Sequence, residues 1–149
     1  MDAAGLEAYL REHIPLSAAM DARVVAASPE EVVLGAPLEP NLNHRNTAFG
    51  GSVAALAILA GWALVHLRLR GDGVEARTVI QRSDVTYLHP VGDAFQARAV
   101  APDPDAWRRF RKALKRFGRG RVVVRAQVLS GGTVVAELDG DYVSLPAID

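Results

Sequence analysis

The feature that most constrains the fold of this 149-residue chain is a run of thirteen apolar residues, from Val53 to Val65. A helix on a protein surface would carry polar residues along one face, and this run has none. It is also shorter than the roughly eighteen apolar residues expected of a membrane span. We therefore expect a buried helix from about Gly51 to Arg70 in a soluble protein, surrounded by protein on nearly all sides.

A polar loop that ends in two glycines leads directly into this helix. The loop reads Asn-Leu-Asn-His-Arg-Asn-Thr-Ala-Phe-Gly-Gly-Ser over residues 41–52. The start of a helix leaves backbone N–H groups unpaired and carries a partial positive charge. Such donors stabilise the negative oxygen that develops when a carbonyl group is attacked. The junction therefore predicts a site for carbonyl chemistry at the helix start.

The remaining pattern is mostly that of short strands with period-two alternation, broken by glycine and proline. The predicted strands cover residues 24–27, 32–34, 76–88, 95–100, 121–129 and 133–145. Helical spacing of apolar residues predicts two further helices, one over the first dozen residues that ends before Pro15, and one over residues 105–117. The chain shows no repeat or linker, so we expect one domain over residues 1–149.

Composition narrows the classes of function. Seventeen basic and seventeen acidic residues give a formal net charge of zero, so no overall field favours a membrane or nucleic acid. The chain has no cysteine, which excludes disulfides and cysteine nucleophiles and is compatible with a cytoplasmic location. His13, His66 and His89 lack the spacing of metal ligands, and we expect neither a metal nor another cofactor.

One long buried helix and about six antiparallel strands predict an α+β protein in which a curved sheet wraps the helix, the hotdog arrangement. A sheet open on one side would leave part of the helix uncovered. A second copy of the chain would cover it, so we expect a homodimer or tetramer with sites at the subunit boundary.

Three sequence segments resemble a known family. They are the loop 41–52, Leu-Ala-Gly-Trp at 59–62 within the helix, and Tyr-Leu-His-Pro-Val at 87–91. Together they resemble the thioesterase domain of the YiiD C-terminal type, a member of the hotdog superfamily, over nearly the whole chain. The resemblance implies binding or hydrolysis of acyl thioesters, with acyl-CoA or an acyl carrier protein as the partner.

The backbone N–H of Gly51 is the predicted donor to the carbonyl oxygen, because glycines let a substrate approach closely. The sequence has no acid between Glu39 and Asp72, where many hotdog thioesterases place the residue that activates water. Three alternatives stay open: Asn43 or Asn46 orients a water, His44 acts as a base, or Asp84 arrives from a strand.

Substrate contacts are predicted in the loop, one turn into the helix, and in a basic segment. They are Asn46, Thr47, Phe49, Gly50, Ala54, Arg108 and Arg109. The space for an acyl chain is predicted beside the small residues Ala54, Ala57 and Gly61, although close packing against the sheet explains these residues equally well. Residues 107–121 hold eight arginines and lysines and no acid, which suits the phosphates of coenzyme A, an acidic carrier protein or a solvated helix face.

The leading hypothesis is therefore a thioesterase, an enzyme that hydrolyses acyl-CoA or acyl carrier protein thioesters. The first alternative is a noncatalytic module that binds acyl thioesters, favoured by the missing carboxylate. A less favoured alternative is a nucleic-acid binder that uses the basic segment at 107–121.

Overall fold

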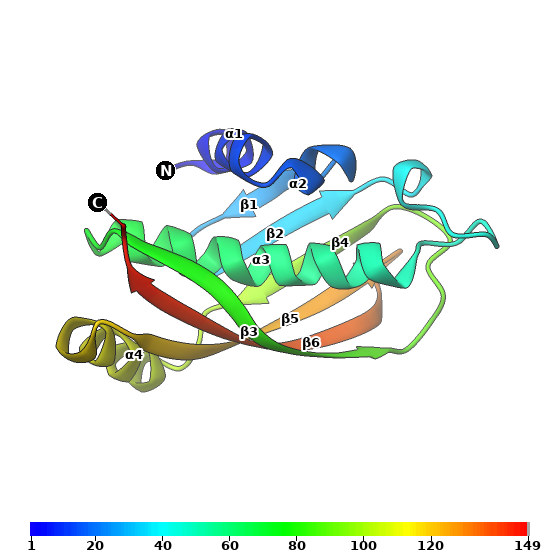
Figure 1. Ribbon diagram of the computed structural model, residues 1–149. Coiled ribbons are helices and arrows are strands. Elements are labelled where there is room, and N and C mark those ends of the chain that lie inside the picture. The colour runs from blue at the N-terminus through cyan, green and yellow to red at the C-terminus, as the bar shows by residue number, and fades with distance from the viewer. Residues whose placement is uncertain (149) are drawn as a thin grey trace.

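The computed structural model describes residues 1–148 and is built around one long helix, α3 (Gly50–Gly71). Its strands form one six-stranded antiparallel sheet in the order β1-β2-β4-β5-β6-β3. Figure 1 shows α3 lying across the concave side of this curved sheet, with α1 and α2 beside it and α4 at its carboxyl end. The other elements are α1 (Ala3–His13), α2 (Pro15–Ala19), β1 (Arg23–Ala27), β2 (Glu31–Ala36), the 3-10 helix η1 (Glu39–Asn41), β3 (Ala76–Tyr87), β4 (Phe95–Val100), α4 (Pro104–Phe117), β5 (Gly120–Ser130) and β6 (Thr133–Pro146).

The predicted hotdog arrangement is confirmed, and the boundaries of α3 and α4 agree with the predicted ones to within a residue. The short elements α2 and η1 were not predicted. Pro15 ends the first helix as expected and then starts α2, because a proline fits the first position of a helix. Asp103 caps α4 by accepting the Asp105 N–H at 2.7 Å, and Gly118 ends it at a φ of 69°.

The two faces of the sheet differ sharply in polarity. Along β5 the residues that face α3 are buried and those between them are exposed. The buried ones are Val122, Val124, Ala126 and Val128. In β3 the register shifts between Ile80 and Arg82, so one extra residue on β3 changes which later side chains face α3.

The sheet covers α3 on one side only. Val53, Leu56 and Leu64 are buried against the sheet and the rest of the core, whereas Ile58 and Trp62 are only half-buried. The sequence had predicted a helix surrounded by protein on nearly all sides. The single chain does not provide that cover. By length and composition α3 could span a membrane, but 67 % of its most apolar 18-residue window is buried in the protein, as in a core helix.

Helix α1 packs against the carboxyl-terminal half of α3 through a stack of rings. The ring centroids of Tyr9 and His66 are 4.6 Å apart, and those of Trp62 and His66 are 4.8 Å apart. Burial, with smaller contributions from Arg70 and His13, lowers the pKa of His66 to about 4. His66 is therefore a neutral packing residue near pH 7, and the Trp62 indole donates to the Thr78 carbonyl oxygen at 2.7 Å.

Tyr142 fixes the closest approach of α3 to the sheet. It is fully buried, and its hydroxyl donates to the Ile58 carbonyl oxygen at 2.6 Å. A Cβ atom on Gly61 would lie 2.3 Å from this hydroxyl oxygen, so only glycine fits there. The small residues Ala57 and Gly61 are buried in the core, so the predicted acyl space beside them is filled by protein.

We expect Gly61→Ala to lower the free energy of unfolding by about 1–3 kcal/mol, the usual cost of overpacking a core. Urea denaturation monitored by circular dichroism measures this change. Gly71→Ala is the matched control, because a Cβ at the end of the same helix meets no atom within 4 Å. Equal stability of the two variants would contradict the packing described for Tyr142.

Candidate functional site

The loop before α3 is anchored at its base by Asn41. The Asn41 side chain is buried, and its amide donates to the carbonyl oxygens of Met20 at 3.0 Å and Pro37 at 2.8 Å. The Asn41 carbonyl oxygen accepts the Phe49 N–H at 2.7 Å, and the Ala48 N–H donates to the Val91 carbonyl oxygen at 2.8 Å. These bonds fix the position at which α3 begins.

Asn43 closes the loop on itself. Its Oδ1 accepts the N–H groups of Arg45 at 2.8 Å and Thr47 at 3.1 Å, while its Nδ2 donates to the Thr47 hydroxyl at 2.8 Å. Asn46, at a φ of 61°, completes the turn in a left-handed conformation that asparagine tolerates. The hydrogen-bonding capacity of the Asn43 side chain is used within the loop, which leaves it unsuited to orienting a water.

We expect Asn43→Ala to cost about 1–3 kcal/mol of stability, because two loop N–H groups lose their acceptor. Asn43→Asp keeps the acceptor oxygen and should retain more of the stability than the alanine variant. Thermal unfolding of both variants checks this order. If Asn43→Ala instead unfolds at the wild-type temperature and loses only activity, then Asn43 acts on the substrate rather than on the loop.

The first two N–H groups of α3 have no acceptor. No side chain caps the helix, and within residues 1–148 neither Gly50 N–H nor Gly51 N–H finds a hydrogen-bond partner. Tyr87 donates its hydroxyl to the Gly50 carbonyl oxygen at 2.9 Å. Because that carbonyl and the Gly51 N–H share one planar peptide group, this bond also fixes the direction of the Gly51 N–H.

A cleft of about 320 Å³ opens beside the start of α3. It lies between the loop before α3 and the segment after β3, and it contains both apolar and hydrogen-bonding side chains. It is lined by Asn43, Thr47, Ala48, Gly50, Val53, Tyr87, Leu88, His89, Pro90, Val91 and Val135. Among these residues His89 is the only one with an imidazole or carboxylate, the groups that most often act as general bases.

An apolar groove of about 240 Å³ runs along the half-buried face of α3. It lies between α2, α3 and β3, and nearly all of its lining is apolar. The lining residues are Ile14, Leu16, Ser17, Met20, Ala55, Ile58, Leu59, Trp62 and Ile80. Gly51, Ala55, Ile58 and Trp62 are spaced three or four residues apart, so the groove continues the helix face on which Gly51 lies.

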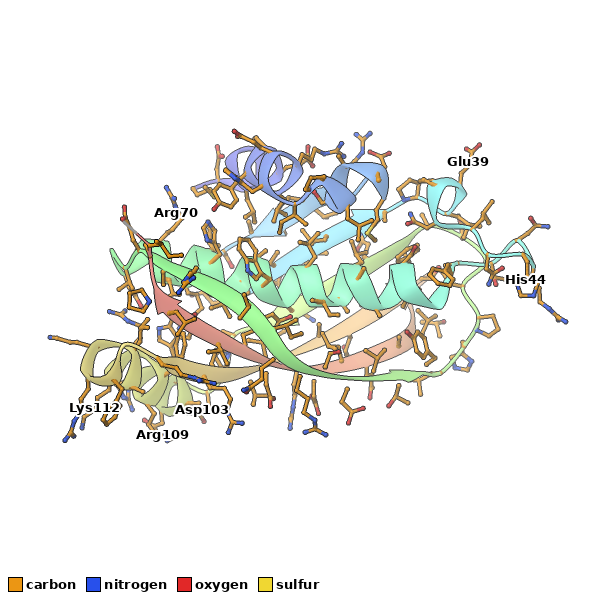
Figure 2. All side chains as sticks on the ribbon, viewed as in Figure 1. Glu39, His44, Arg70, Asp103, Arg109 and Lys112 are labelled. Carbon is orange, nitrogen blue, oxygen red and sulfur yellow. The ribbon has the colours of Figure 1, made fainter. Side chains whose placement is uncertain are left out.

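Several predicted residues lie near the start of α3. Thr47 and Gly50 line the cleft, and the half-buried Ala54 is one turn into the helix. Phe49 is 57 % exposed, and its ring lies over Gly51, 2.3 Å from where a Cβ atom would be. Figure 2 shows His44 at the outer tip of the loop, where it is exposed, rather than in the cleft.

The structure does not bring Asp84 to the start of α3. Because of the register shift after Ile80, Asp84 pairs with Asp139 of β6 on the outer side of the sheet, while Val85 packs toward the core. The Asp84 side chain is 63 % exposed and lies 4.0 Å from Arg82. In the single chain, Asp84 is therefore not placed to activate a water molecule at the start of α3.

Arg108 and Arg109 are likewise far from the loop in the same chain. They lie on α4, which packs at the carboxyl end of α3, about 30 Å from Gly51 at 1.5 Å per helical residue. Figure 2 shows Arg109 and His44 at opposite ends of the molecule. Neither arginine contacts a substrate held at the loop of its own chain.

Tyr87, His89 and the apolar groove were not predicted as parts of the site. Tyr87 ends the long strand β3 and His89 lies two residues beyond it, so their place beside Gly50 depends on the pairing of β3 with β6. The groove depends on α2, a five-residue helix with little periodicity to reveal it. The one signal in the sequence for Tyr87 and His89 was the Tyr-Leu-His-Pro-Val segment at 87–91, which is one of the three segments that resemble the family.

Together, the central helix wrapped by an antiparallel sheet defines a hotdog-fold protein. Residues 3–146 match the family described as "Putative thioesterase (yiiD_Cterm)", and the chain belongs to this family.

Solved structures agree with this assignment. A protein of unknown function from Chlorobaculum tepidum TLS is 27 % identical, with a TM-score of 0.90 over 97 % of this chain and 94 % of that one. A putative thioesterase from Shewanella oneidensis is 29 % identical, with a TM-score of 0.87 over 97 % of both chains. A thioesterase from Haemophilus influenzae, 14 % identical, shares the fold with a TM-score of 0.80 over 100 % of this chain and 94 % of that one.

Proposed function

We propose that the protein hydrolyses acyl thioesters at the start of α3. The observation that supports this most directly is the pair of N–H groups at Gly50 and Gly51, which find no acceptor within residues 1–148. Gly50 lines the cleft that contains an imidazole, and Ala55, about one turn further along α3, lines the groove that is almost entirely apolar. Hydrolysis of a thioester needs a hydrogen-bond donor for the carbonyl oxygen, a base for the attacking water and an apolar surface for the acyl chain. The N–H groups, the imidazole and the groove would supply them in that order.

In the proposed reaction the thioester carbonyl oxygen accepts the Gly51 N–H. His89 takes a proton from a water molecule whose oxygen attacks the carbonyl carbon, and negative charge develops on the carbonyl oxygen. The carbon–sulfur bond then breaks, and the proton passes from the imidazole to the leaving thiolate. The products are a carboxylic acid and a free thiol.

The acyl chain is proposed to lie in the apolar groove from Ala55 toward Trp62. Small side chains at Ala54 and Ala55 leave room beside the carbonyl position, and Trp62 closes the far end with an indole held by Thr78. A groove of about 240 Å³ is smaller than the usual ligand pocket of about 300–1,000 Å³, so it favours one alkyl chain of medium length.

A binding module that does not hydrolyse its ligand is the second candidate. The cleft residues include no carboxylate, which is the observation in its favour.

Thiol release from acyl-CoAs of different chain lengths separates the two candidates, and the protein contributes no thiol background because it has no cysteine. We expect release to be fastest at medium length. Binding of acyl-CoA without release at any length would favour the module instead.

The proposed enzyme is a dimer joined through β3. This strand is a sheet edge of twelve residues, whereas β1 at the other edge has five residues and packs against α1. A long uncovered edge readily pairs with another strand. Val79 on β3 is 54 % exposed, and a second copy paired along this strand would cover it.

We expect the wild-type protein to sediment as a dimer and Val79→Lys to shift it toward monomer, because the dimer would bury two added charges. Analytical ultracentrifugation measures the mass. Val123→Lys is the matched control, since Val123 is also exposed but lies on β5, which is not an edge strand of the sheet. A monomeric wild-type protein, or equal loss of dimer in both variants, would contradict pairing through β3.

A further inference from the structure

The outward face of α4 and the turn after it carry several cations. Three cations of this region are paired, Arg108 with Asp105, Arg111 with Asp72 and Arg121 with Asp141. Five others have no carboxylate partner within residues 1–148, and we call them the α4 basic face: Arg109, Lys112, Lys115, Arg116 and Arg119. The apolar side of α4 is used for the fold, because Trp107, Phe110 and Leu114 are buried.

This face is extended: of its five cations only Arg109 lines the hollow between α4 and the sheet, and the other four lie outside that hollow. Arg109, Lys112 and Arg116 are spaced three and four residues apart, so they form one stripe about 10 Å long along the helix. Figure 2 shows Arg109 and Lys112 pointing away from the protein into solvent. A small phosphate ligand needs donors that converge on one point, whereas a stripe of this kind matches a surface with several acidic groups.

The end of the stripe carries an apolar anchor. Phe117 is 72 % exposed, and the Arg116 guanidinium lies 5.2 Å from the centre of its ring. Exposed aromatic and arginine side chains are the residues that most often dominate protein–protein binding.

The proposed dimer would place this face beside the second active site. The first residue of β3, Ala76, pairs with Pro146, which lies next to Gly118 at the end of α4. The last residue of β3, Tyr87, contacts Gly50. In an antiparallel pair of β3 strands, the Ala76 end of one copy meets the Tyr87 end of the other, so α4 of one subunit would flank the loop site of its partner.

We propose that the α4 basic face docks an acidic acyl carrier protein, which delivers its acyl thioester to the site of the opposite subunit. This inference rests on the proposed hydrolase activity and dimer. It selects a carrier protein over coenzyme A as the preferred donor of the acyl group.

The test compares the same octanoyl group on an acidic acyl carrier protein and on coenzyme A. Lys112→Gln with Arg116→Gln should lower kcat/KM for the carrier about tenfold and weaken its dependence on salt, because charge complementarity accelerates encounter. The same variant should leave octanoyl-CoA hydrolysis unchanged. Arg23→Gln with Arg70→Gln is the matched control, since it removes two cations elsewhere, and it should leave both substrates unaffected.

Each other outcome overturns the proposal in a distinguishable way. An equal loss of kcat/KM with both substrates would indicate that α4 binds the phosphates of coenzyme A. An equal loss in the control variant would indicate that the net charge of the protein, and not the α4 basic face, attracts the carrier. Two outcomes would overturn the docking proposal and leave the hydrolase proposal standing. One is hydrolysis of octanoyl-CoA but not of the carrier thioester. The other is an α4 variant that hydrolyses the carrier thioester at the wild-type rate. Absence of hydrolysis with both substrates would overturn the proposed function itself.

Discussion

Replacing Gly51 with proline should lower kcat for thioester hydrolysis by about 10²–10³-fold, the usual effect of removing one oxyanion donor. Proline has no N–H, and it is tolerated in the first turn of a helix, where no intrahelical bond is lost. The Gly51 N–H has no acceptor within residues 1–148, so its removal costs no hydrogen bond of the fold. Thiol release measured with saturating acyl-CoA gives kcat directly.

Gly51→Ala is the matched control, because it keeps the N–H. A Cβ at this position meets the Phe49 ring, which is exposed and free to turn aside. We expect the alanine variant to retain most of the wild-type kcat and both variants to keep the wild-type circular dichroism spectrum. If the proline variant retains the kcat of the alanine variant, the Gly51 N–H is not the oxyanion donor.

Replacing His89 with alanine should lower kcat by about 10²–10⁴-fold, the contribution typical of a general base. His89 lines the cleft beside Gly50, and its side chain is exposed, so the change leaves the core intact. The kinetic parameters of the variant are measured with the same assay. Because substrate binding is assigned to the groove and to α3, KM should change little.

His44→Ala is the comparison for this prediction, because it removes the other histidine near the site. His44 lies at the exposed tip of the loop and does not line the cleft. We expect the His44 variant to retain the wild-type rate. A loss of rate in this variant, with no loss in the His89 variant, would reverse the two assignments.

The long elements were predictable because each has its own local pattern. The thirteen apolar residues of α3 allow only a buried helix, and the alternation in β5 and β6 fixes which residues face the core. Sheet order depends on contacts between distant residues, such as the pairing of Ala76 with Pro146. No local pattern contains that information.

The site was predictable only in its backbone part. A glycine pair before a buried helix indicates free N–H groups, because this follows from helix geometry alone. Asn43 was interpreted as a water-orienting residue, whereas its hydrogen bonds close the loop. A single extra residue in β3 turns Asp84 to the outer face of the sheet, and sequence alone does not reveal such a register shift.

The central claim is that the start of α3 binds the carbonyl oxygen of an acyl thioester. The most direct measurement is a ¹H–¹⁵N spectrum of the protein titrated with a ketone analogue of acyl-CoA, in which a methylene group replaces the thioester sulfur. The account predicts that the Gly51 amide proton shifts strongly downfield as it donates to the ketone oxygen. Saturable binding of the analogue that leaves the Gly50 and Gly51 amide signals in place would contradict it.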